Sequence, residues 1–514
     1  MNSCAFELMW SCSRFSEIFS SYLPPSALPV RKRFAQNLLF ALAVNALVKP
    51  AYILLIDRTV QVRAGSEAYG HYNALFNLAT IFGVVLDFGL AQYATRMLTV
   101  SPDAVRTEIG PLLRARLFLC GLYAVGVTTA AWVLGFRGDS LLLLGGILGV
   151  QALAQTLLFF RACVASLQRF KTDSILSILD RALLIGVMGA LLLTVSGAGG
   201  FWVPWFVSAQ VGCYTAAVIL AAIVLWRAAG RKLSLGGSSL AVWRAMRGSF
   251  PYALLVFFMA VYTRIDMVLL ERLVSAEEAG RYAAAFRLLD VGNMVGLTVA
   301  AILLPLFGRM LAEGTPAGAI VRAGVTMLLP LSAAAAAVTL FYGADIMASF
   351  YPAASHEGGA LRVHMDGRLL RTLMIAFPAL SLAAVYSTLL TATGALRGMI
   401  AIAAMSAVLN VSVNLLLMPR GGADAAATAA TLTQWAAALA FTLVVTRRAG
   451  LHYDGGWIAR HLLLATILVG AAWAAHWLQI DWRGASAIVL VVAGSAAFAL
   501  RLVSVTEVRR LMQR

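Results

Sequence analysis

Long apolar segments restrict the possible folds of this chain more than any other feature. A helix needs about 20 consecutive apolar residues to cross the hydrocarbon core of a bilayer, and fourteen segments of the sequence reach that length. They are 34–56, 72–95, 115–136, 140–160, 174–195, 201–226, 249–270, 282–307, 323–344, 372–393, 398–418, 425–446, 461–479 and 484–504. Because lipid offers the backbone no hydrogen-bond partner, such spans form helices. The sequence therefore predicts an all-α integral membrane protein with about 14 transmembrane helices.

The composition excludes several classes of protein. Charged residues make up 12% of the chain, against about 25% in soluble proteins, so no water-facing globular domain is expected. The net charge of +17 has no soluble surface that can present it to a nucleic acid, and we expect no such partner. The sequence has no C-x-x-C pair and no G-x-x-x-x-G-K-[ST] motif. We therefore expect no metal site, no cofactor and no ATPase activity.

The distribution of basic residues predicts the orientation. If the N-terminus is cytoplasmic, 26 Lys and Arg residues fall on the cytoplasmic side and 10 on the outer side. Cytoplasmic loops of membrane proteins carry this excess. We therefore expect a multi-pass protein of the cytoplasmic (inner) membrane with both termini in the cytoplasm.

An internal repeat divides the chain into halves. The pattern E-x-x-G-x-Y-x-A-x-F-x-L occurs at 67–78 and again at 277–288, an offset of 210 residues. Each copy lies where the second span of its half begins, so the halves have the same orientation, as in parallel-repeat transporters. The expected organisation is a cytoplasmic N-terminal segment (1–33), an N-lobe of six spans (34–226), a basic cytoplasmic linker (227–248), a C-lobe of six spans (249–446), and two extra spans with a cytoplasmic tail (447–514).

The repeat and two neighbouring motifs resemble a known family. The E-x-x-G-x-Y element, the segment Leu86-Asp87-Phe88-Gly89 and the segment VLNVSVNLLLMP (408–419) are similar to the polysaccharide-transport branch of the multidrug/oligosaccharidyl-lipid/polysaccharide exporter superfamily. The resemblance covers about 35–450. It implies two six-helix lobes around a central cavity that opens alternately to each side. It also implies a flippase for an undecaprenyl-diphosphate oligosaccharide of the O-antigen type, which moves its substrate from the inner to the outer leaflet.

Four basic residues are candidates for binding the diphosphate. Charges inside spans are costly and usually face a cavity or a partner. Lys49 lies inside the first span, one turn after Asn45, and either meets the diphosphate or extends to the outer head groups. Arg264 lies two residues from Asp266, too close along the helix for the two to face each other, so its partner is a phosphate or a carboxylate on another helix. We expect Lys49 and Arg264 to approach a shared central space, with Arg58 and Arg287 nearer its rim.

Each acidic or amide residue inside the spans has two possible roles. Asp87, Asp180, Asp266 and Asp290 are candidates for proton or sodium coupling or for structural ion pairs; for Asp87, near a helix end, we favour the structural role. Asp290 lies three residues after Arg287, which favours a local pair between them. Asn410 and Asn414 form one stripe of the eleventh span. They either bind sugar hydroxyls or, as we favour, hydrogen-bond between helices.

Two other functions remain open. A multidrug or metabolite exporter of the same superfamily is the nearest alternative, although an acidic and aromatic cavity would suit cationic drugs better than an Arg-lined one. A membrane polysaccharide polymerase or ligase is the second, because the outer loop 345–371 carries His, Glu, Asp and Arg residues. The expected partners are the lipid-linked oligosaccharide, membrane lipids, and a polymerase and glycosyltransferases of the same pathway.

Overall fold

The described part of the chain is helical. The computed structural model describes residues 48, 50–100, 105–167, 169–195, 202–228, 239–352, 359–449 and 454–502. Its elements in order are η2 (Tyr52–Asp57), α3 (Arg58–Ala64), α4 (Ser66–Phe82), α5 (Val84–Asp87), α6 (Leu90–Val100), α7 (Val105–Val133), α8 (Asp139–Ser166), α9 (Phe170–Thr194), α10 (Trp202–Ala228), α11 (Ser239–Leu273), α12 (Ala276–Ala312), α13 (Gly318–Phe350), α15 (Gly359–Met374), α16 (Phe377–Ala392), α17 (Leu396–Ala449), α18 (Gly455–Trp477) and α19 (Trp482–Ala499).

These helices account for about 14 membrane spans. Within the described ranges, 11 segments are long and apolar enough to cross a membrane. One of them, α17, contains two predicted spans, because its backbone leaves the helical conformation at Gly422 (φ 53°, ψ −136°). The consecutive helices α4 and α5 together form another span. The described part of the first span ends in η2 and α3. The prediction of an all-α membrane protein with about 14 transmembrane helices is confirmed.

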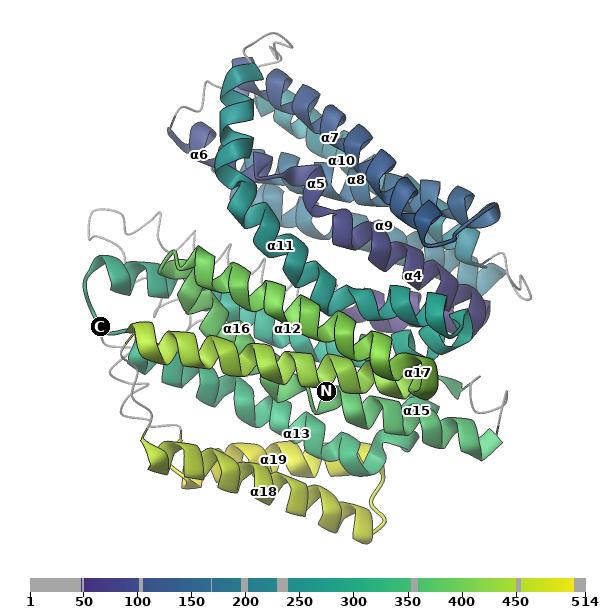
Figure 1. Cartoon of the computed structure of the whole chain (residues 1–514), viewed down its shortest axis with the longest axis vertical. Helices are drawn as coiled ribbons and strands as arrows, with labels where there is room; N and C mark the ends of the chain where they lie inside the picture. The colour runs from purple at the N-terminus through teal and green to yellow at the C-terminus, as the bar shows by residue number, and fades with distance from the viewer. Residues whose placement is uncertain are drawn as a thin grey trace.

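The helices form two lobes and an added pair (Figure 1). We call η2 to α10 the N-lobe and α11 to α17 the C-lobe. In Figure 1 the purple and blue N-lobe helices lie together above the green C-lobe helices, and α11 runs along the boundary between them. The pair α18 and α19 packs against α13, at the edge of the C-lobe away from the N-lobe.

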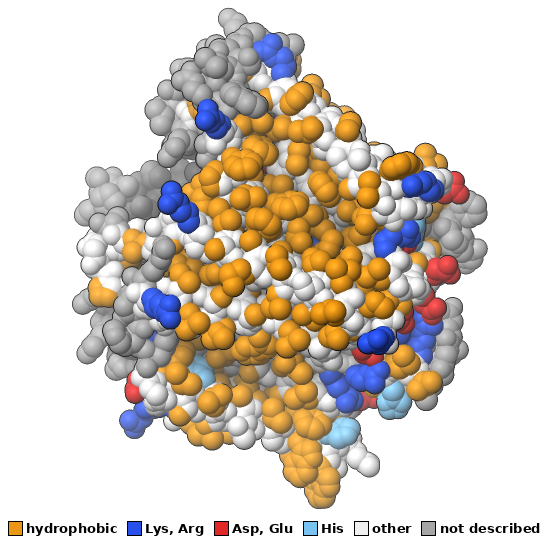
Figure 2. All heavy atoms as spheres, in the orientation of Figure 1, with side chains coloured by type: hydrophobic (Ala, Val, Ile, Leu, Met, Phe, Trp, Pro, Cys, Tyr) orange, Lys and Arg blue, Asp and Glu red, His pale blue; other side chains and the backbone are white. Residues whose placement is uncertain are grey.

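The surface matches a protein surrounded by lipid. Large apolar side chains are exposed along the helices, for example Leu193 (90%) and Leu142 (81%). Figure 2 shows a broad hydrophobic face, with the charged side chains gathered along its two opposite edges. A soluble monomer does not expose a continuous apolar face of this size, so the helices span a membrane.

The two copies of the repeat cross each other at their glycines. A Cβ atom on Gly70 of α4 would lie 1.8 Å from the carbonyl oxygen of Ala276, and one on Gly280 of α12 would lie 1.9 Å from that of Ser66. Ala276 and Ser66 are themselves related by the 210-residue offset, so the contact is reciprocal. The repeat therefore marks a close backbone contact between the lobes, where only glycine leaves room for the two backbones.

We expect Gly70→Ala to weaken this contact between the lobes. The added methyl group overlaps backbone atoms, and overpacking of this kind costs about 1–3 kcal/mol. A lower melting temperature of the purified protein in detergent would show it. Gly121→Ala on α7 is the matched control, because a Cβ there meets nothing within 4 Å. Equal melting temperatures for the two variants would contradict this account of the crossing.

The predicted outer loop 345–371 is largely helical. Residues up to Phe350 belong to α13, and those from Gly359 onward belong to α15. Several charged groups of α15 are held in ion pairs, with Arg362 bound to Glu277 at 2.8 Å and Asp366 bound to Arg281 at 2.7 Å. These groups join helices to one another. The predicted N-terminal segment 1–33, the middle of the linker (229–238) and the C-terminal tail lie outside the described residues.

Candidate functional site

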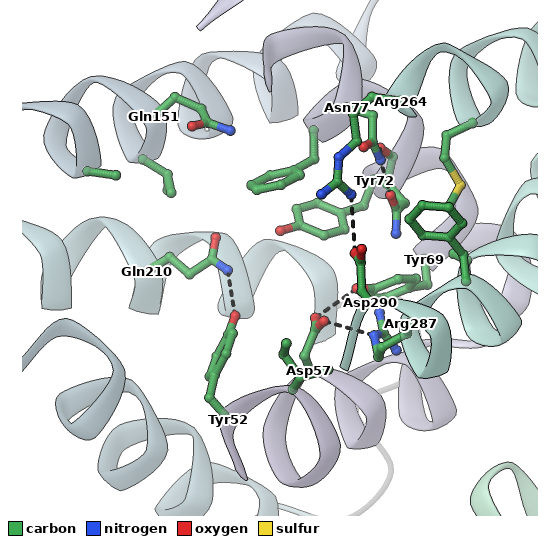
Figure 3. Close-up of a pocket in the computed structure, with 18 of the residues that line it drawn as sticks. Tyr52, Asp57, Tyr69, Tyr72, Asn77, Gln151, Gln210, Arg264, Arg287 and Asp290 are labelled. Atoms are coloured by element: carbon green, nitrogen blue, oxygen red, sulfur yellow. Dashed lines mark hydrogen bonds and ion pairs between the residues drawn. The ribbon is translucent and has the colours of Figure 1, made fainter. Parts of the chain in front are cut away.

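A cavity of about 260 Å³ lies between the two lobes. The N-lobe contributes residues from η2, α4, α8, α9 and α10, and the C-lobe contributes residues from α11 and α12. The lining is Tyr52, Ile53, Asp57, Tyr69, Tyr72, Asn73, Phe76, Asn77, Val150, Gln151, Ala154, Arg181, Gln210, Tyr214, Arg264, Met267, Ala283, Phe286, Arg287 and Asp290. Figure 3 shows polar groups from both lobes meeting in this space. The cavity is therefore polar and aromatic within an apolar protein.

The repeat and a π-helical turn place the lining. Three lining residues of α4, Asn73, Phe76 and Asn77, have lining counterparts 210 positions later on α12, which are Ala283, Phe286 and Arg287. The described part of the first span comprises Val48 and the residues from Pro50 onward, and it continues as the π-helical turn η2. Turns of this kind often occur at functional sites. The two halves thus present equivalent helix faces to one space.

Arg287 joins the lobes at the end of the cavity. Its guanidinium lies 3.0 Å from the carboxylate of Asp57 and also donates to Gln61, Tyr69 and Tyr351. Tyr69 donates to the same Asp57 carboxylate at 2.7 Å. The Arg287 side chain is only 6% exposed. The predicted local pair with Asp290 is wrong, because the helix directs Arg287 across the lobe boundary to a carboxylate of the first span.

Arg264 is held less tightly and faces the cavity. Its Nη1 donates to Asp290 Oδ2 at 3.3 Å, and its guanidinium lies 5.7 Å from the centre of the Phe286 ring. The two side chains of the ion pair are 35% and 33% exposed. Figure 3 shows the pair at one wall, separate from the Asp57–Arg287 pair. Arg264 can therefore exchange Asp290 for another anion at small cost.

Arg181 is a lining residue that the sequence argument left out of the predicted site. It lies in the middle of α9, donates to the hydroxyl of Tyr214 at 2.7 Å, and stacks over the Tyr52 ring at 4.8 Å. One sequence signal was present: Arg181 is one of four basic residues within the predicted spans. Its place in the cavity depends on how α9 packs, which the sequence does not show.

Neutral polar groups cover much of the N-lobe wall. Gln210 donates to the hydroxyl of Tyr52 at 3.3 Å, and Gln151 donates to Thr80 at 2.8 Å. Asn73 and Asn77 hydrogen-bond to each other on α4. Amide and hydroxyl groups next to aromatic rings can bind sugars, because they offer donors, acceptors and flat apolar faces.

Asn410 and Asn414 do not line the cavity. Both are fully buried, and Asn414 donates to Asp266 at 2.6 Å, which joins α17 to α11. Asp266 is 2% exposed and also accepts from Tyr282 at 3.1 Å. Asn414 therefore makes the inter-helix hydrogen bond that we favoured over sugar binding, whereas Asn410 accepts from Asn414 within α17. Arg264 and Asp266 bind separate partners, as their spacing predicted.

The remaining predicted residues lie outside the cavity or outside the described residues. Arg58 does not line it: its guanidinium donates to the backbone oxygen of Phe350 and so links α3 to α13. Asp87 pairs with Arg116 of α7 at 3.3 Å, which fits the structural role. Asp180 lies behind the lining, 3.6 Å from Arg181. Asn45 and Lys49 fall on residues that the structure does not describe.

The arrangement suits an anion carried on a polar head group. Three arginines and two aspartates line the space, so the lining carries one net positive charge. Small-molecule sites occupy about 300–1,000 Å³, and the cavity lies just below that range. An oligosaccharide head group would need the lobes to separate further on one side.

Two family models match the sequence. One, described as a polysaccharide biosynthesis protein, matches residues 35–311. The other, described as the lipid II flippase MurJ, matches residues 275–495. No curated protein matches the sequence significantly.

Solved transporter structures share the fold. The lipid II flippase MurJ in an inward closed conformation superposes with a TM-score of 0.70 at 12% identity, covering 90% of this chain and 99% of its own. An inward-facing multidrug resistance MATE transporter gives 0.60 at 14% identity, with 80% and 98% covered. A MOP superfamily transporter from Pyrococcus furiosus gives 0.55 at 14% identity, with 85% and 95% covered. Identities this low establish the fold alone. The first family model spans more than half of the sequence, and the chain therefore belongs to the polysaccharide biosynthesis protein family.

Proposed function

We propose that this protein is a flippase that moves a lipid-linked oligosaccharide, carried on undecaprenyl diphosphate, across the cytoplasmic membrane for cell-surface polysaccharide synthesis. The observation that carries the proposal is the cavity between the lobes, where Arg264 and Arg181 stand beside a wall of amides and tyrosines. A diphosphate bears at least two negative charges and cannot cross hydrocarbon unaided. An O-antigen precursor is the substrate type we expect, with both termini of the chain in the cytoplasm.

The position of the contacts between the lobes suggests an order of steps for the transport cycle. The Gly70–Gly280 crossing and the Arg287–Asp57 pair hold the lobes together at the end where α3 meets α4. From the excess of basic residues predicted on the cytoplasmic side, we infer that this end faces outward. The head group enters from the cytoplasmic side and binds Arg264, and the outer contacts then break to release it. The lipid tail stays in the bilayer throughout.

Reconstituted vesicles test the proposal directly. The purified protein is placed in liposomes that contain a fluorescent polyprenyl-diphosphate oligosaccharide in both leaflets, and a membrane-impermeant reagent destroys the outer fluorescence. We expect the protein to expose the inner pool to the reagent much faster than empty liposomes do. An inner pool that remains protected as in empty liposomes would refute the flippase function.

The same vesicles separate the flippase from the exporter. The cavity has one net positive charge in its lining, which repels cationic drugs. We therefore expect no efflux of an organic cation such as ethidium under an imposed proton or sodium gradient. Ethidium efflux without flipping would favour the multidrug exporter in its place.

Asp266 is our candidate for energy coupling. It is buried at 2% exposure, and its hydrogen-bond partners among the described residues, Tyr282 and Asn414, are neutral. A buried carboxylate without a cationic partner is costly unless it binds a proton or a cation. It also joins α11 to α17, two helices that a change of lobe shape would move.

We expect Asp266→Asn to uncouple transport from ion gradients. Asparagine keeps the shape and the hydrogen bond from Tyr282 but carries no charge to be neutralised. Flipping by the variant should no longer respond to an imposed proton or sodium gradient, while flipping by the parent protein does. Ser406→Ala, a buried substitution in the same α17, serves as the control. A variant that responds as the parent does would remove Asp266 from this role.

A further inference from the structure

Arg181 differs from the other two arginines of the cavity in how its charge is balanced. Arg287 has a carboxylate at 3.0 Å and three further acceptors, and Arg264 has a carboxylate at 3.3 Å. Within the described ranges, the carboxylate nearest Arg181 is that of Asp180 at 3.6 Å, beyond ordinary hydrogen-bond length. Among the described residues, its one hydrogen-bond acceptor is the Tyr214 hydroxyl.

Aromatic contacts fix Arg181 in place while leaving donors available. Its guanidinium lies 4.8 Å from the Tyr52 ring centre and 5.7 Å from that of Tyr214. A guanidinium has five N–H donors in a planar fork that fits an oxyanion, and the bond to Tyr214 uses one of them. The side chain is 29% exposed and lines the cavity.

Arg181 and Arg264 belong to different lobes. Arg181 lies on α9, beside Gln210 and the other amides of the N-lobe wall, whereas Arg264 lies on α11. A substrate held by Arg264 through one phosphate would extend its remaining head group toward the N-lobe wall. A charge there needs its own partner, because an isolated anion within the membrane is costly.

We infer that Arg181 forms a second anion subsite, which binds an oxyanion of the substrate head group other than the one held by Arg264. Two groups have this chemistry: the second phosphate of the diphosphate and a carboxylate of an acidic sugar such as a uronic acid. The inference rests on the proposed flippase function and adds a substrate class to it. If the carboxylate is the ligand, the natural oligosaccharide is acidic.

Three polyprenyl probes distinguish the two sources. The first carries a neutral disaccharide on a diphosphate, the second a uronic-acid disaccharide on a diphosphate, and the third a neutral disaccharide on a monophosphate. The flipping rate of Arg181→Gln is compared with that of the parent protein for each probe. Arg137→Gln is the control, because it removes the same charge from an exposed position outside the cavity lining.

A lost charge-assisted contact should slow flipping by about tenfold or more. A loss confined to the uronic-acid probe identifies the carboxylate as the ligand. An equal loss for both diphosphates, greater than that for the monophosphate, identifies the second phosphate. Arg181→Lys should recover part of the lost rate. Equal losses for all three probes, or no loss for any, would overturn the subsite. If the parent protein flips no probe, the proposed function itself fails, which is a separate result.

Discussion

Arg264→Ala is expected to abolish flipping of the lipid-linked oligosaccharide while the protein remains inserted and abundant. A guanidinium can hold a phosphate through two charge-assisted hydrogen bonds, each worth about 1.5–3 kcal/mol. Losing both should slow transport at least about a hundredfold. Arg264→Lys should keep part of the rate, since the charge survives and the planar fork does not. The vesicle assay measures both variants.

The stability of Arg264→Ala separates a substrate role from a structural one. The ion pair with Asp290 is about one-third exposed on both sides, and pairs of this kind contribute about 0–1 kcal/mol. The melting temperature should therefore change little. Normal flipping by Arg264→Ala would show that the proposed phosphate site is wrong, although the fold and the family would stand.

Arg287→Ala is expected to cause the largest loss of stability of any variant considered. The substitution leaves the Asp57 carboxylate without its cation and removes donors from Gln61, Tyr69 and Tyr351. Breaking a buried pair from one side costs about 3–5 kcal/mol, because the remaining charge stays buried. Thermal unfolding in detergent measures the loss.

Two variants test the cause of that loss. Arg309→Ala lies on the same helix, and its pair with Glu313 is 44% and 49% exposed, so its melting temperature should hardly change. The double variant Asp57→Asn, Arg287→Gln removes both charges and should regain part of the stability lost in Arg287→Ala. If the double variant regains none of the stability lost in Arg287→Ala, the ion pair does not hold the lobes together.

The sequence predicted the fold well, because hydrophobicity and repeat spacing are properties of single segments. The 210-residue offset even relates three of the positions through which α4 and α12 line the cavity. Partners across helices were not predictable in the same way. Arg287 lies three residues from Asp290, and local spacing favoured that pair, whereas packing brings Asp57 from 230 positions earlier in the chain.

The candidate site was predicted in part for the same reason. Arg264 and Arg287 were identified because charges within spans are conspicuous, but only Arg264 has exposure to the cavity comparable with that of Arg181. Nothing in the sequence predicts that Arg58 contacts α13. Nothing in it predicts that Arg181 lies beside Tyr52 and Tyr214. The direction of each side chain and the packing of the lobes decide these contacts, and neither can be predicted from a single sequence.

Protection of a cysteine in the cavity is the most direct test of the central claim that the head group binds between the lobes. In a variant without the native cysteines, Ala154→Cys places a thiol in the lining, and Thr315→Cys places one on the exposed connection between α12 and α13. The account predicts that a polyprenyl-diphosphate oligosaccharide slows maleimide labelling at 154 and leaves labelling at 315 unchanged, and that Arg264→Ala removes the protection. A rate of labelling at position 154 that the substrate does not change would contradict binding between the lobes.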